Sequence, residues 1–412
     1  MRIHTAPGRL GTGLAHAAMV GALALGCVRM TDAPARAGLV APAAPPINTP
    51  PRVAEDPQGP PRTDRVVLLV IDGARWQDVF SGVDPARAQR SGMTEEQIVG
   101  AEELTPNLHA LAQRGVALGG EGSPFLSSGP NFVSLPGYVE ILTGRPATCW
   151  ENDCPADGAA TLVDDFRAMP GATDANIVML SSWDRLANVT GSAPDRATIS
   201  TGRKTGHNLD ALRADPQGAF FYDRGRDSAP APGYGDYRPD GATADLAVHL
   251  LHATQPKFLF LSLGDPDERA HQGDYPGYLA ALRAADATLG RLVAEIASWG
   301  EAGRHVTVAV TADHGRCDNF NEHGSHCAES ARTFLVMGGG AVPRKGLVAL
   351  KEERHLRDIA PTLLALAQVP SSTKSGEGTK DLGAPIAEIT APRDQRVAGA
   401  LQGAPPGAAS TP

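Results

Sequence analysis

The 412-residue sequence has no excess of basic residues, no internal repeat and no long, uniformly apolar run. It contains 37 lysines and arginines and 46 aspartates and glutamates, which gives a formal net charge of −9. This balance argues against a basic surface that holds nucleic acid, so we expect no nucleic-acid partner. Residues 10–26 are mostly apolar, but this stretch is too short and too weakly apolar for a membrane-spanning helix. The hydrophobic content of 42% is ample for the core of one large domain or two.

Carboxylates and histidines follow three apolar runs that are typical of buried strands of a parallel sheet. Asp72 closes the run from Arg65 to Ile71, and Asp313-His314 follows the run from His305 to Ala312. The run from Lys257 to Leu263 leads to Asp267 and His271, which share one face if the segment is helical. Each motif alone is usual in turns, helix caps or solvated surfaces. All three at strand ends indicate an α/β protein whose site lies at the carboxyl edge of the sheet.

Aspartate oxygen and histidine nitrogen together are a ligand set that Zn²⁺ accepts, and Mn²⁺ accepts it as well. Ser134 lies in Val133-Ser134-Leu135-Pro136, and a helix can begin close behind it, at Tyr138. A hydroxyl at a helix amino terminus meets free N–H groups and a positive dipole end, both of which favour an anion. The alternative interpretation of Ser134 is an ordinary helix cap. Because we expect metal ligands nearby, we interpret Ser134 as a nucleophile that a divalent metal activates.

These motifs, in this order over residues 63–370, resemble the alkaline phosphatase superfamily. The nearest branch is the nucleotide pyrophosphatase/phosphodiesterase and phosphoglycerate-mutase-like group. The segments that carry the resemblance are Ile71-Asp72-Gly73, Ser134-Leu-Pro-Gly-Tyr138, Leu142-Thr-Gly144, Pro266-Asp267 to His271, Thr311-Ala-Asp313-His314-Gly315 and Asp358-Ile-Ala-Pro-Thr-Leu-Leu364. The resemblance implies a three-layer α/β/α sandwich with a mostly parallel central sheet.

The resemblance also implies two divalent metal ions, most readily Zn²⁺ with Mn²⁺ as the alternative. Asp72, Ser134, Asp313 and His314 would surround one ion. Asp267, His271 and a later histidine would hold the other. We prefer His323 for that place, with His326 second and His355 third. Asn152, 18 residues after Ser134, matches the asparagine that holds a phosphate oxygen in the phosphodiesterase branch.

The implied activity is hydrolysis of phosphoric esters of small molecules, of the phosphodiesterase or phosphatase type, through a phosphoseryl intermediate. Sulfatases of this superfamily have an arginine two residues after the proline of their signature, where this chain has Tyr138. Formylglycine-based sulfatase activity is therefore disfavoured. The alternatives are phosphotransferase or mutase chemistry, or sulfuric ester hydrolysis, at the same site. The alternative from a different functional class is a non-catalytic extracytoplasmic binding lipoprotein with this fold. The sequence does not indicate the oligomeric state.

The first 27 residues are typical of a lipoprotein signal peptide, with basic residues followed by a small-residue apolar stretch that ends at Cys27. Lipidation of Cys27 would anchor the protein to a membrane. We therefore expect an exported protein, either a lipoprotein of the bacterial periplasm or outer membrane, or a secreted one. The other four cysteines fit two local disulfides, Cys149–Cys154 and Cys317–Cys327. The second would fix the loop that carries His323; free thiols are the alternative.

The expected domain organisation follows from changes in composition. Residues 28–62 are rich in alanine and proline and predict an extended tether. Residues 63–370 form the catalytic domain, in which the irregular segment 201–240 is either a cap over the site or a surface loop. Residues 371–412, rich in proline, alanine and glycine, predict a loosely ordered tail.

Overall fold

The computed structural model describes residues 61–154, 158–229, 236–372 and 381–390. The predicted signal peptide, the lipidation residue Cys27 and the tether up to residue 60 lie outside these ranges. Within them, no helix is long and apolar enough to cross a membrane.

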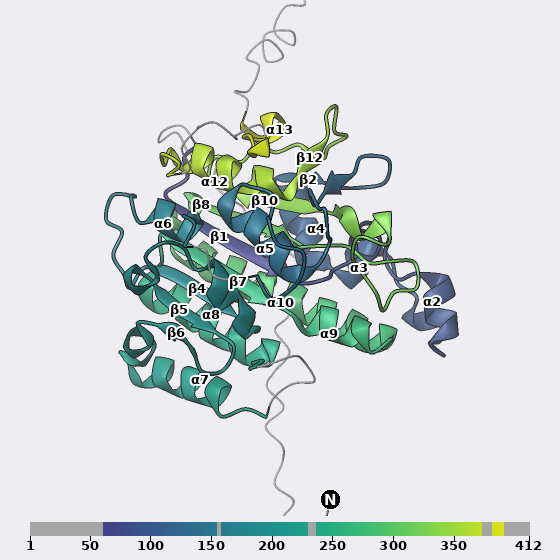
Figure 1. The fold of residues 1–412 in the computed structure, drawn as a ribbon, viewed down its shortest axis with the longest axis horizontal. Helices are drawn as coiled ribbons and strands as arrows, with labels where there is room; N and C mark the ends of the chain where they lie inside the picture. Colours follow the sequence, from purple (N-terminus) through teal and green to yellow (C-terminus); the bar gives the residue numbers. More distant parts are fainter. Residues whose placement is uncertain (1–60, 155–157, 230–235, 373–380, 391–412) are drawn as a thin grey trace, which may run out of the picture. The chain divides into compact units, whose positions relative to one another are not determined.

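A mostly parallel sheet of nine strands, counted over the described residues, forms the centre of the protein (Figure 1). Its order is β11-β2-β10-β8-β1-β7-β4-β5-β6. Strand β10 runs antiparallel to both of its neighbours, and β6 antiparallel to β5. The strands are β1 (Arg65–Ile71), β2 (Val116–Leu118), β4 (Ile177–Ser181), β5 (Thr198–Thr201), β6 (Thr205–His207), β7 (Phe258–Leu263), β8 (Val306–Thr311), β10 (Leu335–Gly339) and β11 (Gly346–Leu347). A second sheet has the order β12-β3-β9, with β3 (Phe125–Leu126), β9 (Arg332–Thr333) and β12 (Arg354–His355).

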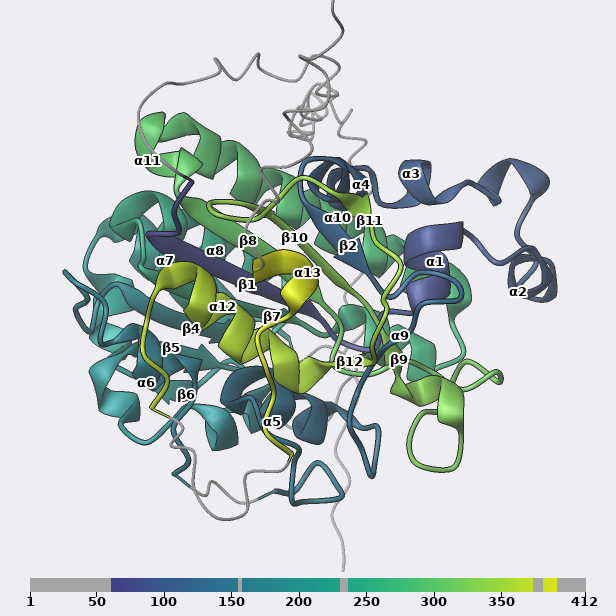
Figure 2. The same ribbon diagram turned by 90° about the horizontal axis from the view of Figure 1, so that it is seen from above.

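Helices cover both faces of the large sheet and make the three layers that the sequence motifs predicted (Figures 1 and 2). Successive side chains of β1 point to opposite faces, so Val67 and Leu69 enter one buried core and Val66 and Leu68 the other. The first core contains residues of α1 (Trp76–Ser81), α2 (Pro85–Arg90), α3 (Ala101–Leu104), α4 (Pro106–Gln113), α7 (Pro216–Arg226), α8 (Asp240–Thr254), α9 (Asp265–His271) and α10 (Tyr275–Ser298). The second contains residues of α5 (Ser134–Thr143), α6 (Leu162–Phe166), α12 (Ile359–Ala367) and α13 (Ala387–Thr390).

The three strands that precede the predicted ligands are neighbours in the sheet. Strand β1 pairs in parallel with β7 on one side and β8 on the other, with Ile71 opposite Leu263 and Val70 opposite Thr311. Because parallel strands end at the same edge, the segments that follow them meet there. Each strand agrees with its predicted run to within one residue at either end.

Part of the predicted tail belongs to the packed domain. Ile386 and Ile389 are buried in the core that contains α12, and the Ile386 N–H donates to the hydroxyl of Thr362. These two apolar residues stand in a segment rich in proline and glycine, so composition alone did not predict their burial. Residues 373–380 and 391–412 of the predicted tail lie outside the described ranges.

The segment 201–240, predicted to be irregular, contains the edge strand β6 and the helix α7. Asp215 caps α7 by accepting hydrogen bonds from the N–H groups of Gln217 and Gly218. Helix α7 packs against α8 and against a 3-10 turn at Leu209–Arg213. A role for this segment as a cap over the site stays a prediction.

Candidate two-metal active site

Ser134 is the first residue of α5 and lies at the carboxyl edge of the central strands. Its side chain is buried, and the hydroxyl donates to Asp72 Oδ1 at 3.3 Å and lies 3.1 Å from His314 Nε2. Gly137, one turn further along α5, allows this close approach because it has no Cβ, and a Cβ there would overlap the Asp313 carbonyl. The helix therefore presents a buried hydroxyl directly to two of the predicted ligands.

The first group of ligands is Asp72, Asp313 and His314, whose ligand atoms all lie within 4.8 Å of one another. The Gly73 N–H donates to Asp313 Oδ1 at 3.0 Å, while the buried Asp313 Oδ2 has no hydrogen-bond partner. A buried carboxylate oxygen without a partner is costly unless a cation meets it. His314 Nε2 lies 3.6 Å from this oxygen and 3.1 Å from the Ser134 hydroxyl.

Tyr138 and Ser262 hold Asp72 from behind. The Tyr138 hydroxyl donates to Asp72 Oδ2 at 3.0 Å and lies 2.7 Å from the hydroxyl of Ser262 on β7. Both residues are buried. One oxygen of Asp72 is thus fixed by the protein, and the other faces Ser134.

The second group of ligands is Asp267, His271 and His323. Asp267 and His271 stand one turn apart on α9, with Asp267 Oδ2 3.1 Å from His271 Nε2. His323 comes from the loop after β8, and its Nε2 lies 3.1 Å from that of His271. Its ring also stacks on His314 at a centroid distance of 3.9 Å, which joins the two groups.

All three histidines have the same tautomer, which their surroundings determine. His314, His271 and His323 each place Nδ1 at hydrogen-bond distance from a backbone carbonyl, at 2.8, 3.0 and 3.0 Å. A carbonyl can only accept, so each Nδ1 carries a hydrogen and each neutral ring has a bare Nε2. Carbonyl-bound Nδ1 atoms of this kind orient metal-ligating histidines.

These residues fit two divalent cations. Three histidine Nε2 atoms and three aspartates converge in two groups of the donor type that zinc takes, and one buried oxygen has no other partner. The ligand set predicted from the sequence is therefore brought together in space. His326 lies outside it, with an exposed side chain 3.5 Å from Glu322, and His355 lies on β12 beside Glu353.

The buried residue Arg316 also belongs to this site, and the sequence reasoning missed it. Its Nη1 donates to Asp267 Oδ1, its Nε donates to the Phe320 carbonyl, and its Nη2 has no partner. Gly73, with a φ of +61°, leaves room for this pair, because a Cβ there would collide with Asp267 and Arg316. The only sequence signal was the position of Arg316 directly after the Asp-His-Gly motif.

Burial and mutual charge shift the pKa values of the ligands in opposite directions. Burial, and then the charge of Asp72, raise the pKa of Asp313 well above its usual range. Burial acts the same way on Asp267, but Arg316 and the neighbouring histidines outweigh it and hold that pKa well below its usual range. For His314, burial lowers the pKa, yet Asp313 and Asp72 outweigh it and raise the pKa to about 9.

Asn152 lies close to Ser134, and its oxygen has a structural role. Asn152 Oδ1 accepts the Leu135 N–H at 2.9 Å and so satisfies the first free N–H after Ser134. That N–H is therefore not available to a phosphate oxygen, contrary to our expectation that the N–H groups after Ser134 serve the substrate. The amide nitrogen of Asn152 remains as the donor for that purpose.

Both predicted disulfides, Cys149–Cys154 and Cys317–Cys327, are present. The first closes the loop that carries Asn152, and the second closes the loop that carries His323. Asn131 joins the two loops, because its amide nitrogen donates to the Trp150 carbonyl and its oxygen accepts the Ser325 N–H.

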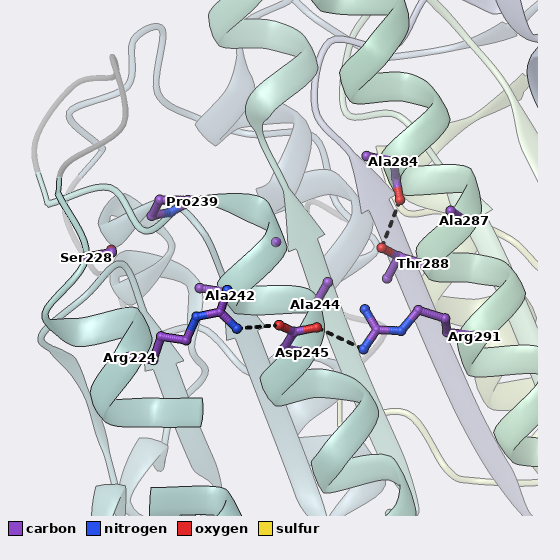
Figure 3. Close-up of a pocket in the computed structure, with 11 residues that line it drawn as sticks. Arg224, Ser228, Pro239, Ala242, Ala244, Asp245, Ala284, Ala287, Thr288 and Arg291 are labelled. Atoms are coloured by element: carbon purple, nitrogen blue, oxygen red, sulfur yellow. Dashed lines mark hydrogen bonds and ion pairs between the residues drawn. The ribbon is translucent and has the colours of Figure 1, made fainter. Parts of the chain in front are cut away.

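A separate cleft lies between α7, α8 and α10 and shares no lining residue with either ligand group (Figure 3). Asp245 lies between Arg224 and Arg291 and pairs with both, at 3.1 and 2.9 Å. The two guanidinium groups thus share one carboxylate, which makes this cleft a weaker candidate for an anion site.

Residues 233–371 match the family model described as Metalloenzyme superfamily. A 2,3-bisphosphoglycerate-independent phosphoglycerate mutase from Haloquadratum walsbyi is 28% identical over 236 residues, which cover 54% of this chain and 44% of that protein. Its counterpart from Chloroflexus aurantiacus is 30% identical over 206 residues, covering 45% and 37%. The chain thus spans less than half the length of these mutases.

Solved structures show the same fold at low sequence identity. A putative sulfatase from Bacteroides thetaiotaomicron superimposes with a TM-score of 0.53 at 12% identity, covering 81% of this chain and 76% of that one. Wild-type alkaline phosphatase PafA superimposes with a TM-score of 0.50 at 13% identity, covering 81% and 100%.

These matches fit the resemblance to the alkaline phosphatase superfamily that the sequence motifs carry. The mutases agree with the phosphoglycerate-mutase-like part of the predicted branch. The phosphodiesterase part stays a prediction. Within this fold, the two ligand groups occupy the carboxyl edge of the strands, where open α/β sheets bind their ligands.

Proposed function

We propose that the protein is a metal-dependent phosphoric ester hydrolase in which Ser134 is the nucleophile. One observation carries the proposal: the Ser134 hydroxyl lies 3.1 Å from His314 Nε2, at the first turn of a helix and within a convergence of three aspartates and three histidine Nε2 atoms. Because His314 is itself one of the proposed metal ligands, a cation held there is suited to activate this hydroxyl.

Bound divalent ions would polarise the phosphoryl oxygens and offset the charge on the attacking and leaving oxygens. Asp72, Asp313 and His314 would hold one ion, and Asp267, His271 and His323 the other. Zn²⁺ suits this donor set, and Mn²⁺ is the alternative.

The protein's own groups perform the remaining tasks. Asp72 Oδ1 accepts the Ser134 hydrogen and so orients the oxygen that attacks phosphorus. Tyr138 keeps Asp72 in place, which limits the movement of that acceptor. The Asn152 amide nitrogen would donate to a phosphoryl oxygen, a contact worth about 2.7–4 kcal/mol in comparable sites. The Ser134 oxygen would form a bond to phosphorus as the bond to the leaving alcohol oxygen breaks, and water would then cleave the phosphoserine bond, which frees Ser134 and releases phosphate from a monoester or a phosphomonoester from a diester.

Phosphotransfer is the second candidate, and the curated relatives favour it because they are phosphoglycerate mutases. The same serine can pass its phosphoryl group to an alcohol instead of water. Hydrolysis of sulfuric esters is less favoured, since Tyr138 stands where the formylglycine sulfatase signature has an arginine. Phosphoesters of small molecules are therefore the proposed substrates.

We further propose that the protein acts after export. Two disulfides in the described residues support an oxidising compartment. The amino-terminal sequence with Cys27 supports a lipid anchor in the periplasm or outer membrane, with secretion as the alternative.

Turnover of three chromogenic esters by the purified protein tests the function. We expect zinc-dependent hydrolysis of p-nitrophenyl phosphate or its bis-p-nitrophenyl diester, and little or none of p-nitrophenyl sulfate. Comparison of the hydrolysis rates of the monoester and the diester distinguishes phosphatase from phosphodiesterase activity. Phosphoglycerate isomerisation without ester hydrolysis would favour the mutase. Zinc binding without any turnover would contradict catalysis and favour a binding protein.

A further inference from the structure

An exposed tryptophan stands on the disulfide loop next to the proposed nucleophile. Trp150 is 54% exposed, whereas the other three tryptophans of the chain, Trp76, Trp183 and Trp299, are buried or half-buried. An exposed indole offers a large, flat aromatic face on which a ligand ring can stack.

The loop restrains the backbone of this residue. The Cys149–Cys154 disulfide closes the loop on both sides of Trp150, and Asn131 donates to the Trp150 carbonyl. The backbone of such a short, cross-linked loop has little freedom left to lose when a ligand binds, which reduces the entropic cost of binding.

The loop is attached to the catalytic serine from both directions. Asn152, two residues after Trp150, bonds to the N–H of Leu135, the neighbour of Ser134. Asn131, which bonds to Trp150, precedes Ser134 by three residues and also contacts the loop of His323. The backbone of Trp150 therefore lies close to the proposed phosphoryl site.

We infer that Trp150 forms a subsite for the leaving group and that the preferred substrates are phosphoric esters whose leaving group carries a flat aromatic ring. The inference rests on the proposed function, since it places the ring next to a phosphoryl group at Ser134. The indole face stacks on the leaving group while Asn152 and the bound cations hold the phosphoryl group. Stacking of this kind corresponds to about a fivefold to tenfold gain in affinity.

Binding of phenylphosphonate and methylphosphonate to the zinc-loaded protein, measured by calorimetry, tests the inference without requiring turnover. The unaltered protein should bind the phenyl compound about fivefold to tenfold more tightly. Trp150→Ala should remove this preference and leave the methylphosphonate affinity unchanged, and Trp150→Phe should retain most of it. Phe220→Ala, which removes an aromatic ring of 59% exposure on α7, is the matched control and should retain the full preference.

A preference that persists in Trp150→Ala, or that is absent from the unaltered protein, would overturn the inference while leaving the proposed function intact. Binding of neither compound to zinc-loaded protein would contradict the proposed function and the subsite together. Parallel loss of affinity for both compounds in Trp150→Ala would show a structural role for the loop and would also overturn the subsite.

Discussion

His271 and His323 present their Nε2 atoms to each other at 3.1 Å, while the Nδ1 of each lies 3.0 Å from a backbone carbonyl. Two bare ring nitrogens at this distance repel each other unless a proton or a cation lies between them. Burial lowers the pKa of His271, but the hydrogen bond and charge of Asp267 outweigh burial and raise that pKa. A divalent ion held by Asp267, His271 and His323 would remove the repulsion between the two nitrogens.

The second metal site should depend on His323 and not on His326. We expect His323→Ala to bind about half as much zinc per chain as the unaltered protein, because one of two ligand groups loses a nitrogen. His326→Ala, three residues away on the same loop, should bind the full amount. Metal analysis after dialysis measures both, and equal zinc content in the two variants would contradict the assignment.

Arg316 should stabilise the metal-free protein more than the metal-loaded one. Arg316→Met leaves Asp267 as a buried charge without its partner, which costs about 3–5 kcal/mol when no other cation is present. Bound zinc would supply that missing charge. Denaturant unfolding with chelator and with zinc should show a large loss in the first case and a smaller one in the second.

Arg316→Lys is the matched control for this experiment, because it keeps the positive charge and should lose less stability with chelator. An equal loss for Arg316→Met under both conditions would mean that Asp267 meets no cation other than Arg316.

The two disulfides should differ in what they protect. Removing Cys317–Cys327 by paired serine substitutions frees the loop of His323, so we expect weaker binding of the second zinc. Removing Cys149–Cys154 in the same way frees the loop of Asn152 and should lower turnover while zinc content stays complete. Zinc titration and ester hydrolysis on both variants distinguish these effects, and identical behaviour would contradict the separate roles.

Glu140 should make the protein less stable as the pH rises. Burial raises the pKa of this α5 carboxyl from 4.5 to about 7 against the opposing hydrogen bonds from Ser127 and Ser128. A raised carboxyl pKa favours the folded state fully below 4.5, and this contribution is lost as the pH rises through 7. The difference of about 2.5 pKa units corresponds to about 3 kcal/mol.

Glu140→Gln is nearly isosteric, and its amide oxygen can still accept the Ser128 N–H. Its free energy of unfolding should therefore fall less than that of the unaltered protein between pH 4.5 and pH 8. Unfolding curves at several pH values measure the difference, and parallel profiles would show that Glu140 does not titrate in this range.

The sequence predicted the parts of the site that are local in the chain. The runs before Asp72, Asp267 and Asp313 are buried strands, and a buried parallel strand is recognisable from its uninterrupted apolar residues. The pairing of β1 with β7 and β8 then brings their carboxyl ends together, as the fold class requires.

Contacts that depend on loop paths could not be predicted in the same way. His323 and His326 stand three residues apart on one loop, and only the folded path of that loop separates a ligand from an exposed side chain. Arg316 carries no periodic signal, and its role follows from its burial against Asp267. Ile386 and Ile389 stand in a proline- and glycine-rich segment, so their burial on the side of α12 was missed.

The most direct test of the account is to identify the group that carries the phosphoryl intermediate. Zinc-loaded protein would be mixed with p-nitrophenyl phosphate, quenched in acid within the first turnovers and examined by peptide mass spectrometry. We predict a phosphoryl group on Ser134 and none elsewhere in the peptide, with both the modification and turnover absent in Ser134→Ala although its zinc content is unchanged. Turnover that persists in Ser134→Ala, or steady hydrolysis without phosphoserine at this position, would contradict Ser134 as the nucleophile.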